Sequence, residues 1–399
     1  MQRQRFAKLG ASMASSGVDA VVAIGLPNVR YATGLEARLC DSARAHYERS
    51  IAVVFAGDAA AHLFTSQREG IPADHPESHS HPPLHLEFEE GVDALADFLR
   101  KHLGSDGGRV AIDESTAAMH VRLGDALDHT LSRWELADGA RVFGAARLCK
   151  TTDEVLCIRR AQAINEAAMR DVLAYLQPGV RQCELTAQFL RRIHELGATA
   201  NEIDPIWQIM APRLAENPWS TRGDLPFPRT TTDRFLREGD VVWVDTGITV
   251  HGYASDFGRT WICARAPQPS PEQRDAFERW RAVVARVVES VRPGVSGLDL
   301  VNVAKRGEPR TPWMSHFYLA HGVGLNSAEM PLIGTDMGEA FDAEIELRPG
   351  MILVLEPAIW SDGHAGYRSE EIVAVTEEGC VFLSHFPYTP YAPAEGDAP

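Results

Sequence analysis

Residues 241–247 read Val-Val-Trp-Val-Asp-Thr-Gly, an apolar run typical of a buried β-strand with Asp245 near its end. The pair His251-Gly252 follows as a turn signal, and residues 253–261 return as Tyr-Ala-Ser-Asp-Phe-Gly-Arg-Thr-Trp. A hairpin centred between residues 250 and 251 makes Asp245 and Asp256 direct cross-strand partners. Their Cβ atoms then lie about 5 Å apart on one face, and the two carboxylates repel each other unless a cation lies between them or one is protonated.

A second hairpin repeats this arrangement. Residues 351–357 read Met-Ile-Leu-Val-Leu-Glu-Pro, and residues 367–375 return as Tyr-Arg-Ser-Glu-Glu-Ile-Val-Ala-Val. Centring this hairpin on Gly363 makes Glu356 and Glu370 cross-strand partners. Four converging carboxylates suit divalent cations, and two metal ions about 3.5–4 Å apart would neutralise them.

An imidazole completes the candidate site. Residues 320–325 read Ala-His-Gly-Val-Gly-Leu, which places His321 among small residues that allow close approach. A site rich in carboxylate oxygen with one histidine suits Mn, Co, Fe or Zn better than Mg. The alternative for each acid is an exposed strand edge or an ion pair with Arg259 or Arg368. The pattern as a whole favours metal, with five predicted ligands: Asp245, Asp256, His321, Glu356 and Glu370.

The two hairpins lie in similar surroundings. Capping-box patterns at Thr151–Glu154 and Ser270–Gln273 each open an amphipathic helical segment, and both segments are predicted to end at Pro-Gly, at 178–179 and 293–294. A further helix-prone stretch and a strand-rich stretch follow each one, which suggests a duplicated unit. Residues 1–147 instead predict a small α/β domain. We therefore expect two domains, 1–147 and 148–399, of mixed α/β (α+β) class.

Composition excludes several partners. The chain has 399 residues, 39 Lys+Arg and 55 Asp+Glu, giving a net charge of −16. Nucleic acids and anionic membrane surfaces need a basic footprint, so neither is expected as a partner. No apolar run reaches the roughly 20 residues of a membrane span, and no signal core follows the N-terminus, so a cytoplasmic location is expected. The six scattered cysteines are read as reduced thiols.

Residues 71–85 contain four prolines and four histidines, the latter at positions 75, 79, 81 and 85. Their irregular spacing in a proline-rich stretch predicts a solvated loop, with metal binding as the less favoured alternative.

Taken together, these motifs resemble the creatinase/prolidase/aminopeptidase P superfamily, the pita-bread metallohydrolases. The resemblance rests on the motifs at 245–247, 255–260, 321–325 and 367–370 and extends over residues from about 150 to 385. It implies a pseudo-symmetric catalytic domain after a creatinase-type N-terminal domain, and usually a homodimer. In such a dimer one subunit closes its partner's site, and Arg44, His46 and Tyr47 would be candidates for those contacts.

The resemblance also implies functional roles. The five predicted ligands would bind two divalent metal ions (Mn, Co, Zn or Fe), bridged by Asp256 and Glu370. These ions would activate water, with Glu356 accepting its proton. Arg368 would bind a substrate carboxylate, the alternative being an ion pair with Glu371 or Asp362. The implied reaction is hydrolysis of a C–N bond in a dipeptide or other small molecule, as in Xaa-Pro dipeptidases. A non-catalytic scaffold is disfavoured, because all five ligands are present.

Two departures bear on the substrate. Peptidases of the superfamily carry histidines where this chain has Pro228 and Ala328, and losing such donors costs about 100-fold or more in rate. His251, His316 and His364 are candidate replacements. Trp219, His251 and Glu329 are predicted to contact substrate. Residues 211–213 and 217–219 are similar to the dimethylsulfoniopropionate lyase branch, although Gly247 stands where that branch has an extra metal-binding acid. A lyase and a creatinase-like amidinohydrolase therefore remain alternatives.

Overall fold

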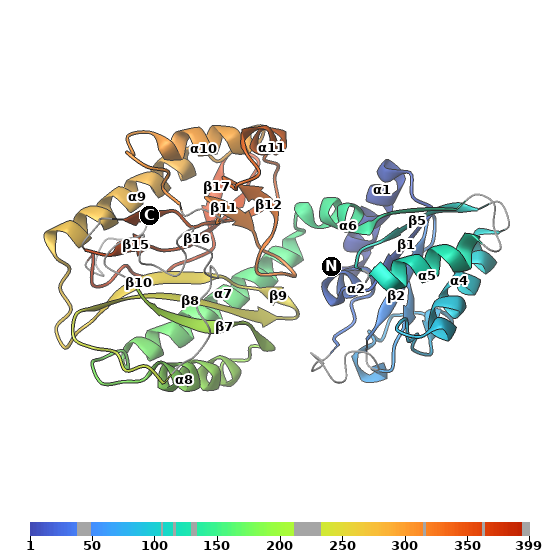
Figure 1. Ribbon diagram of the computed structural model, residues 1–399, viewed down its shortest axis with the longest axis horizontal. Helices are drawn as coiled ribbons and strands as arrows, with labels where there is room; N and C mark the ends of the chain where they lie inside the picture. The colour runs from blue at the N-terminus through green and yellow to red at the C-terminus, as the bar shows by residue number, and fades with distance from the viewer. Residues whose placement is uncertain are drawn as a thin grey trace. The chain divides into compact units, whose positions relative to one another are not determined.

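The computed structural model describes residues 1–37, 49–104, 107–114, 117–128, 134–210, 233–313, 317–360 and 364–392. It divides into two units, Met1–Arg147 and Leu148–Pro399. Each unit has its own sheet structure and its own apolar core (Figure 1). Trp219, Pro228 and His316 lie outside the described residues, as do Arg44, His46 and Tyr47.

The first unit is built on a six-stranded mixed sheet of order β4-β3-β2-β1-β5-β6. Its strands are β1 (Ala20–Ala23), β2 (Ile51–Phe55), β3 (His62–Phe64), β4 (Ser80–His81), β5 (Gly108–Ile112) and β6 (Trp134–Asp138). Its helices are α1 (Gln2–Ser16), α2 (Leu26–Thr33), α4 (Glu89–Leu103), α5 (Ala117–Asp128) and α6 (Gly139–Leu148). Strand β1 is antiparallel to β2 and parallel to β5.

Helix α4 covers part of this sheet. Its apolar residues Val92, Leu95, Ala96 and Leu99 follow the i, i+3, i+4, i+7 spacing of one helix face and are buried in the core with β1 and β2. The predicted solvated loop over 71–85 is partly wrong, because His79 ends a 3-10 helix (Glu77–His79) and His81 pairs in β4 with Phe64 of β3.

The second unit contains two helix–helix–sheet halves. The first half comprises α7 (Thr152–Leu173), α8 (Gln182–Glu195), β7 (Ala200–Ile209), β8 (Asp240–Val250), β9 (Tyr253–Ala254) and β10 (Phe257–Cys263). The second half begins with α9 (Pro271–Ser290), α10 (Gly297–Lys305), β11 (Ala320–Gly322), β12 (Glu329–Ile333) and α11 (Glu339–Glu344). It continues with β13 (Ile352–Leu355), β14 (Ala358–Trp360), β15 (Gly366–Arg368), β16 (Glu371–Val375) and β17 (Cys380–Phe382). The strand orders are β10-β8-β7 and β12-β11-β13-β16-β17, with a separate β14-β15 pair.

The predicted duplication is visible in matching backbone contacts. Gly179 and Gly294 both have left-handed φ values, 93° and 82°, which glycine adopts readily. Their N–H groups donate to the carbonyl oxygens of Leu236 and Leu347, at 2.8 and 2.9 Å. Both predicted capping boxes form. Helix α7 nevertheless ends at Leu173, before Pro178, so that predicted end was too late.

The helices of the second unit lie on the outer sides of its sheets. Helices α7 and α8 pack against β8 and β10 in one core, and α9 and α10 pack against β11, β13 and β16 in another. Figure 1 shows the strands in between, so that the two predicted hairpins face each other.

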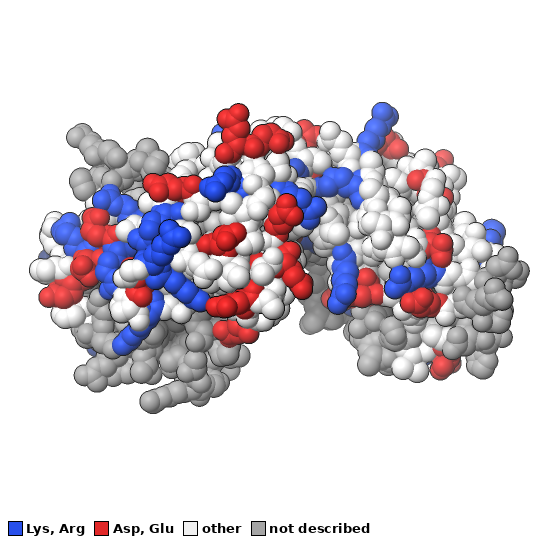
Figure 2. Space-filling view, turned by 90° about the horizontal axis from the view of Figure 1, so that it is seen from above, with Lys and Arg blue, Asp and Glu red and all other residues white. Residues whose placement is uncertain are grey.

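Among the described residues, no helix combines the length and apolar character needed to cross a bilayer. No disulfide joins the five described cysteines. On the face shown in Figure 2, acidic and basic side chains are interspersed.

Candidate metal centre

The first hairpin carries Asp245 and Asp256 with a register different from the predicted one. Asp245 pairs with Gly258, and Val250 pairs with Tyr253. The two-residue turn is therefore His251-Gly252, where both residues have positive φ, 50° and 78°. This conformation is typical of tight hairpin turns. The predicted direct pairing of Asp245 with Asp256 was wrong by two positions, which makes them diagonal neighbours.

The second hairpin has the predicted register. Leu355 pairs with Glu371 and Ala358 pairs with Arg368, so Glu356 and Glu370 occupy the matching positions between these two ladders. Glu370 then reaches across to the first hairpin. Its side chain lies over Gly258, where a Cβ atom would be 2.5 Å from the Glu370 Cδ. Glycine at 258 therefore allows Glu370 to approach Asp245 and Asp256.

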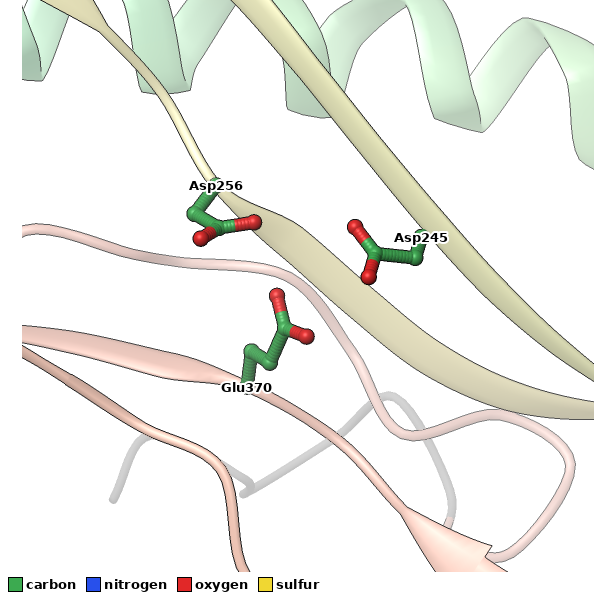
Figure 3. Close-up of side chains that lie close together, drawn as sticks. All are labelled: Asp245, Asp256 and Glu370. Atoms are coloured by element: carbon green, nitrogen blue, oxygen red, sulfur yellow. The ribbon is translucent and has the colours of Figure 1, made fainter. Parts of the chain in front are cut away.

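Three carboxylates converge at this point. Asp245, Asp256 and Glu370 each offer an oxygen within 4.8 Å of the others, and all three side chains are buried. Figure 3 shows the three carboxyl groups pointing toward one another, from the two strands of the first hairpin and from the facing segment that carries Glu370. Among the described residues, no other group of three acidic, histidine or cysteine side chains converges this closely.

His321 and Glu356 border the same cluster. The Nε2 atom of His321 lies 3.4 Å from Asp256 Oδ2 and 3.4 Å from Glu356 Oε1. Its Nδ1 atom lies 2.9 Å from the carbonyl oxygen of Gly322. Because a carbonyl only accepts hydrogen bonds, Nδ1 carries the proton and the Nε2 lone pair faces the carboxylates. This is the tautomer that a metal-binding histidine needs.

One guanidinium group lies among the carboxylates. Arg368 is buried and donates to Glu356; its Nη2 is 3.0 Å from Glu370 Oε1 and its Nη1 is 3.8 Å from Asp245 Oδ2. The guanidinium also stacks over the Trp243 ring, 3.8 Å from its centroid. These partners differ from the expected Glu371, which pairs with Arg259 at 2.8 Å; Asp362 lies outside the described residues.

The charge balance tests whether this donor set fits metal ions. Four buried carboxylates face one guanidinium, so up to three negative charges lack a cation. Asp245 Oδ1 and Glu370 Oε2 are buried without a hydrogen-bond partner. Burying charge without compensation is costly. Two divalent cations would supply the missing positive charge and occupy the unpartnered oxygens, so the residues fit a dinuclear centre.

The pKa values of these acids reflect the same imbalance. Burial raises the pKa of Asp245 to about 7, against the opposing influence of Arg368. Burial and repulsion from neighbouring carboxylates raise the pKa values of Asp256 and Glu370 well above their usual range. Without added positive charge, these groups therefore tend to hold protons near neutral pH.

A polar network fixes the first hairpin behind the cluster. The Asn165 side chain on α7 is fully buried and donates to the Thr246 carbonyl at 2.9 Å and to Ser255 Oγ at 3.0 Å. It also accepts a hydrogen bond from the Thr246 hydroxyl at 2.9 Å. Thr246 and Ser255 directly adjoin Asp245 and Asp256. Sequence reasoning missed Asn165, because nothing local distinguishes it from any other polar residue on a helix.

A cavity of 410 Å³ opens onto the centre. It is lined by Ile203, Asp204, Ile206, Asp245, Asp256, Phe317, Tyr318, His321, Ser327, Ala328, Glu356, Arg368 and Glu370. Ala328 thus lines the cavity at the position where histidine was expected in a peptidase. Sequence reasoning missed Tyr318, whose ring lies 5.3 Å from that of His321. Burial and the nearby Glu356 raise its pKa, so its hydroxyl stays protonated.

Two predicted substrate-binding residues are not in the lining. His251 lies in the exposed turn, about 20 Å along the strand from Asp245 at the usual rise per residue. Glu329 forms an ion pair with Lys150, at 2.9 Å, in which both side chains are largely buried. His364 lies 3.7 Å from Glu272, in a largely exposed pair. Neither His251 nor Glu329 is among the residues that line this cavity, and their substrate contacts stay predictions.

Comparisons with known proteins agree with this architecture. A model of the creatinase/prolidase N-terminal domain matches residues 5–149, and a model of metallopeptidase family M24 matches residues 156–377. The chain is 28% identical over 240 residues to a Xaa-Pro dipeptidase of Pyrococcus furiosus, covering 60% of this chain. It is 26% identical over 259 residues to the uncharacterised peptidase YqhT of Bacillus subtilis, covering 64% of this chain and 68% of that protein. The match spans 63% of the length of several curated relatives, including the P. furiosus protein.

Solved structures share the fold. A Xaa-Pro dipeptidase from Bacillus anthracis superposes with a TM-score of 0.74 at 20% identity, covering 97% of this chain and 98% of that one. An X-Pro aminopeptidase from Thermotoga maritima gives 0.74 at 22% identity, covering 97% and 99%. The predicted superfamily and fold class are thereby confirmed. Because the family model covers more than half of the chain, the protein belongs to metallopeptidase family M24, with a creatinase/prolidase domain preceding its catalytic unit.

Proposed function

We propose that this protein is a dinuclear metal-dependent hydrolase that cleaves the C–N bond of a small Xaa-Pro dipeptide or similar substrate. The observation that carries the proposal is the buried convergence of Asp245, Asp256 and Glu370 beside His321 and Glu356, at the base of a cavity. Membership of a metallopeptidase family and similarity to a Xaa-Pro dipeptidase support it.

The five side chains Asp245, Asp256, His321, Glu356 and Glu370 would hold two divalent cations of the Mn, Co, Zn or Fe type. When bound, such ions polarise a carbonyl oxygen and lower the pKa of water toward neutrality. As the resemblance to the superfamily implies, Asp256 and Glu370 would be the ligands common to both ions. Both converge with Asp245, and Asp256 Oδ2 also lies 3.4 Å from His321 Nε2.

Glu356 and Arg368 are the proposed proton acceptor and substrate anchor. Glu356 Oε1 faces His321, and its other oxygen accepts from Arg368. Glu356 would take a proton from the attacking water and return it to the leaving nitrogen. Arg368 Nη1 is buried and has no hydrogen-bond partner. Since Arg368 lines the cavity, this donor is available to a substrate carboxylate.

Tyr318 is the proposed donor to the oxygen that gains charge during the reaction. It lines the cavity beside His321, and its raised pKa keeps the hydroxyl protonated. A hydrogen bond that strengthens as charge develops is typically worth 10²–10³-fold in rate. Tyr318 would thereby perform the task for which relatives use a histidine at the position of Ala328.

The cavity suits a dipeptide. Its 410 Å³ falls within the usual range of small-molecule sites, roughly 300–1,000 Å³. Ile203, Ile206 and Phe317 provide apolar wall for a pyrrolidine ring, and Asp204 offers an exposed carboxylate for an α-ammonium group.

The test is cleavage of a panel of Xaa-Pro dipeptides before and after chelation, with the amine product quantified. Chelator-sensitive release of proline supports the proposal. Because Ala328 rather than histidine lines the cavity, the panel also includes dimethylsulfoniopropionate and creatine. Formation of acrylate without any dipeptide cleavage would replace the proposal with the lyase alternative.

A homodimer and a cytoplasmic location remain predictions. The mass of the full chain in solution, measured by light scattering, tests the first.

A further inference from the structure

A second cluster of metal-binding side chain types lies in the first unit, at the β4–β3 edge of its sheet. His62 of β3 is buried, and the rings of His79, His81 and His102 lie around it. Their centroids are 4.0, 5.2 and 5.1 Å from that of His62. His62 begins β3, His79 ends the 3-10 helix, His81 ends the edge strand β4, and His102 lies in the last turn of α4.

The imidazoles of His62 and His81 already lie almost as close together as two ligands of one metal ion. The Nδ1 atom of His62 lies 3.0 Å from Nε2 of His81. Ligands of one tetrahedral ion with bonds of about 2.0 Å are about 3.3 Å apart, so a cation could replace the shared proton with little movement.

In His62 and His102, the ring nitrogen that would not bind the metal lies near an oxygen atom that could orient the ring. Asp58 Oδ2 lies 3.6 Å from His62 Nε2 and has no hydrogen bond in the described structure. The Nδ1 atom of His102 lies 2.8 Å from the Phe98 carbonyl oxygen and therefore carries the proton, which leaves Nε2 with its lone pair. Histidines that bind metal almost always donate their other N–H to a carboxylate or a backbone carbonyl.

Packing alone leaves polar atoms of this cluster unsatisfied. His79 Nδ1 and the neighbouring His75 Nε2 are buried without a hydrogen-bond partner. A buried polar group without a partner destabilises the fold. Burial and the surrounding histidines lower the pKa of His62 to about 4, and the pKa of His81 is also lowered, chiefly by burial. Neutral imidazoles have free lone pairs for a metal ion.

We propose that His62, His79, His81 and His102 form a binding site for one borderline divalent transition-metal ion, of which zinc is the representative. Imidazole suits Zn, Ni and Cu, whereas oxygen ligands suit Mn. The His79 ring now stacks on His62 with an interplanar angle of 25°, so binding turns it until its nitrogen faces the ion. Asp58 is a positioning residue, acting through His62.

The experiment compares zinc content of the chelated and reconstituted full-length chain with that of the double variant His79→Asn/His81→Asn. His85→Asn is the matched control, because His85 lies in the same proline-rich segment but is not one of the four proposed ligands. We expect the double variant to bind one zinc fewer per chain, and the control to bind as many as wild type. Copper bound to the wild type should show nitrogen hyperfine splitting that the double variant loses.

Equal zinc content in wild type and double variant would overturn the proposal. Unchanged manganese binding by the double variant shows that the catalytic unit is intact. Should the double variant not fold, His102→Gln decides, because His102 is exposed. We expect it to weaken zinc binding at least tenfold, and unchanged affinity would equally overturn the proposal. Asp58→Asn should weaken binding 10–100-fold, as for other residues that orient ligands.

Discussion

The carboxylate cluster of the catalytic unit and the imidazole cluster of the N-terminal unit solve opposite electrostatic problems. In the first cluster, too little positive charge faces the buried carboxylates. Burial and mutual repulsion therefore raise the pKa values of Asp245, Asp256 and Glu370. In the second cluster, burial and repulsion from the neighbouring histidines lower the pKa of His62. Its imidazole therefore tends to stay neutral, with a lone pair that can bind a metal ion. Either condition favours a metal ion, but of different hardness.

The two clusters also differ in how far they are preformed. Three carboxylates of the first cluster already converge within 4.8 Å, and Asn165 fixes the strands that carry two of them. In the second cluster two rings still stack, and only His62 and His81 share a short contact. We infer that the proposed dinuclear centre is preformed, whereas the proposed imidazole site would assemble only when its metal ion binds.

The largest effect is expected for Asp256→Asn. Removing a shared ligand should lower turnover more than 100-fold and abolish tight manganese binding. The metal-free form should become more stable, by about 1 kcal/mol or more, because a neutral amide replaces a buried acid whose ionisation is opposed by burial and by its neighbours. Metal analysis, turnover and thermal unfolding of the chelated protein check this.

The matched control for that variant is Asp240→Asn, at the start of β8 in the same hairpin but outside the cluster. Loss of stability without loss of metal in Asp256→Asn would contradict the role assigned to the carboxylate.

The pKa values of Asp245 and His62 are shifted in opposite directions. In the metal-free chain, the stabilities of the two units should therefore depend on pH in opposite ways. The pKa of Asp245 is raised from 3.8 to about 7, so its contribution to catalytic-unit stability is present below about pH 4 and lost as pH rises through 7. The pKa of His62 is lowered from 6.5 to about 4, so its contribution to the N-terminal unit is present above about pH 6.5 and lost as pH falls through 4.

We expect the free energy of unfolding to change by a few kcal/mol through Asp245 and by about 1–2 kcal/mol through His62, allowing for solvent screening. Hydrogen exchange of each unit between pH 4 and 7 measures both slopes. Asp245→Asn and His62→Phe should each flatten one of them. Slopes of the same sign in both units would refute the electrostatic comparison.

Tyr318→Phe, beside the carboxylate cluster, and His79→Asn/His81→Asn, in the imidazole cluster, together test whether only the first cluster takes part in the reaction. Tyr318→Phe should lower kcat about 100-fold or more with little change in KM or metal content, because a donor to the reacting oxygen is lost. The control Tyr175→Phe alters an exposed tyrosine and should have no effect. Turnover should also survive His79→Asn/His81→Asn. A change confined to KM in Tyr318→Phe would instead assign Tyr318 to substrate binding.

Asn165→Ala tests how the carboxylate cluster is preformed. It should weaken manganese binding about tenfold, because Asp245 and Asp256 lose the network that orients their strands. Titration of the chelated protein with manganese measures this, with Gln188→Ala on α8 as the control. Unchanged affinity would mean that the hairpin holds its carboxylates without Asn165.

The sequence was most informative where a local pattern sets the geometry. The matching Pro-Gly endings of two amphipathic helical segments predict the duplicated halves, and the second hairpin has its predicted register. The first register could not be placed, because the turn depends on whether His251 accepts a positive φ. Tyr318, Asn165 and the meeting of His62 with His102 arise only from tertiary packing, which brings together residues distant in sequence.

The most decisive experiment is manganese titration of the chelated full-length protein, followed by assay on a Xaa-Pro dipeptide. Manganese prefers oxygen ligands and therefore reports on the carboxylate cluster alone. We predict two manganese ions per chain, with dipeptide cleavage returning as they bind. Manganese binding no greater than that of Asp256→Asn would contradict a dinuclear centre in this protein.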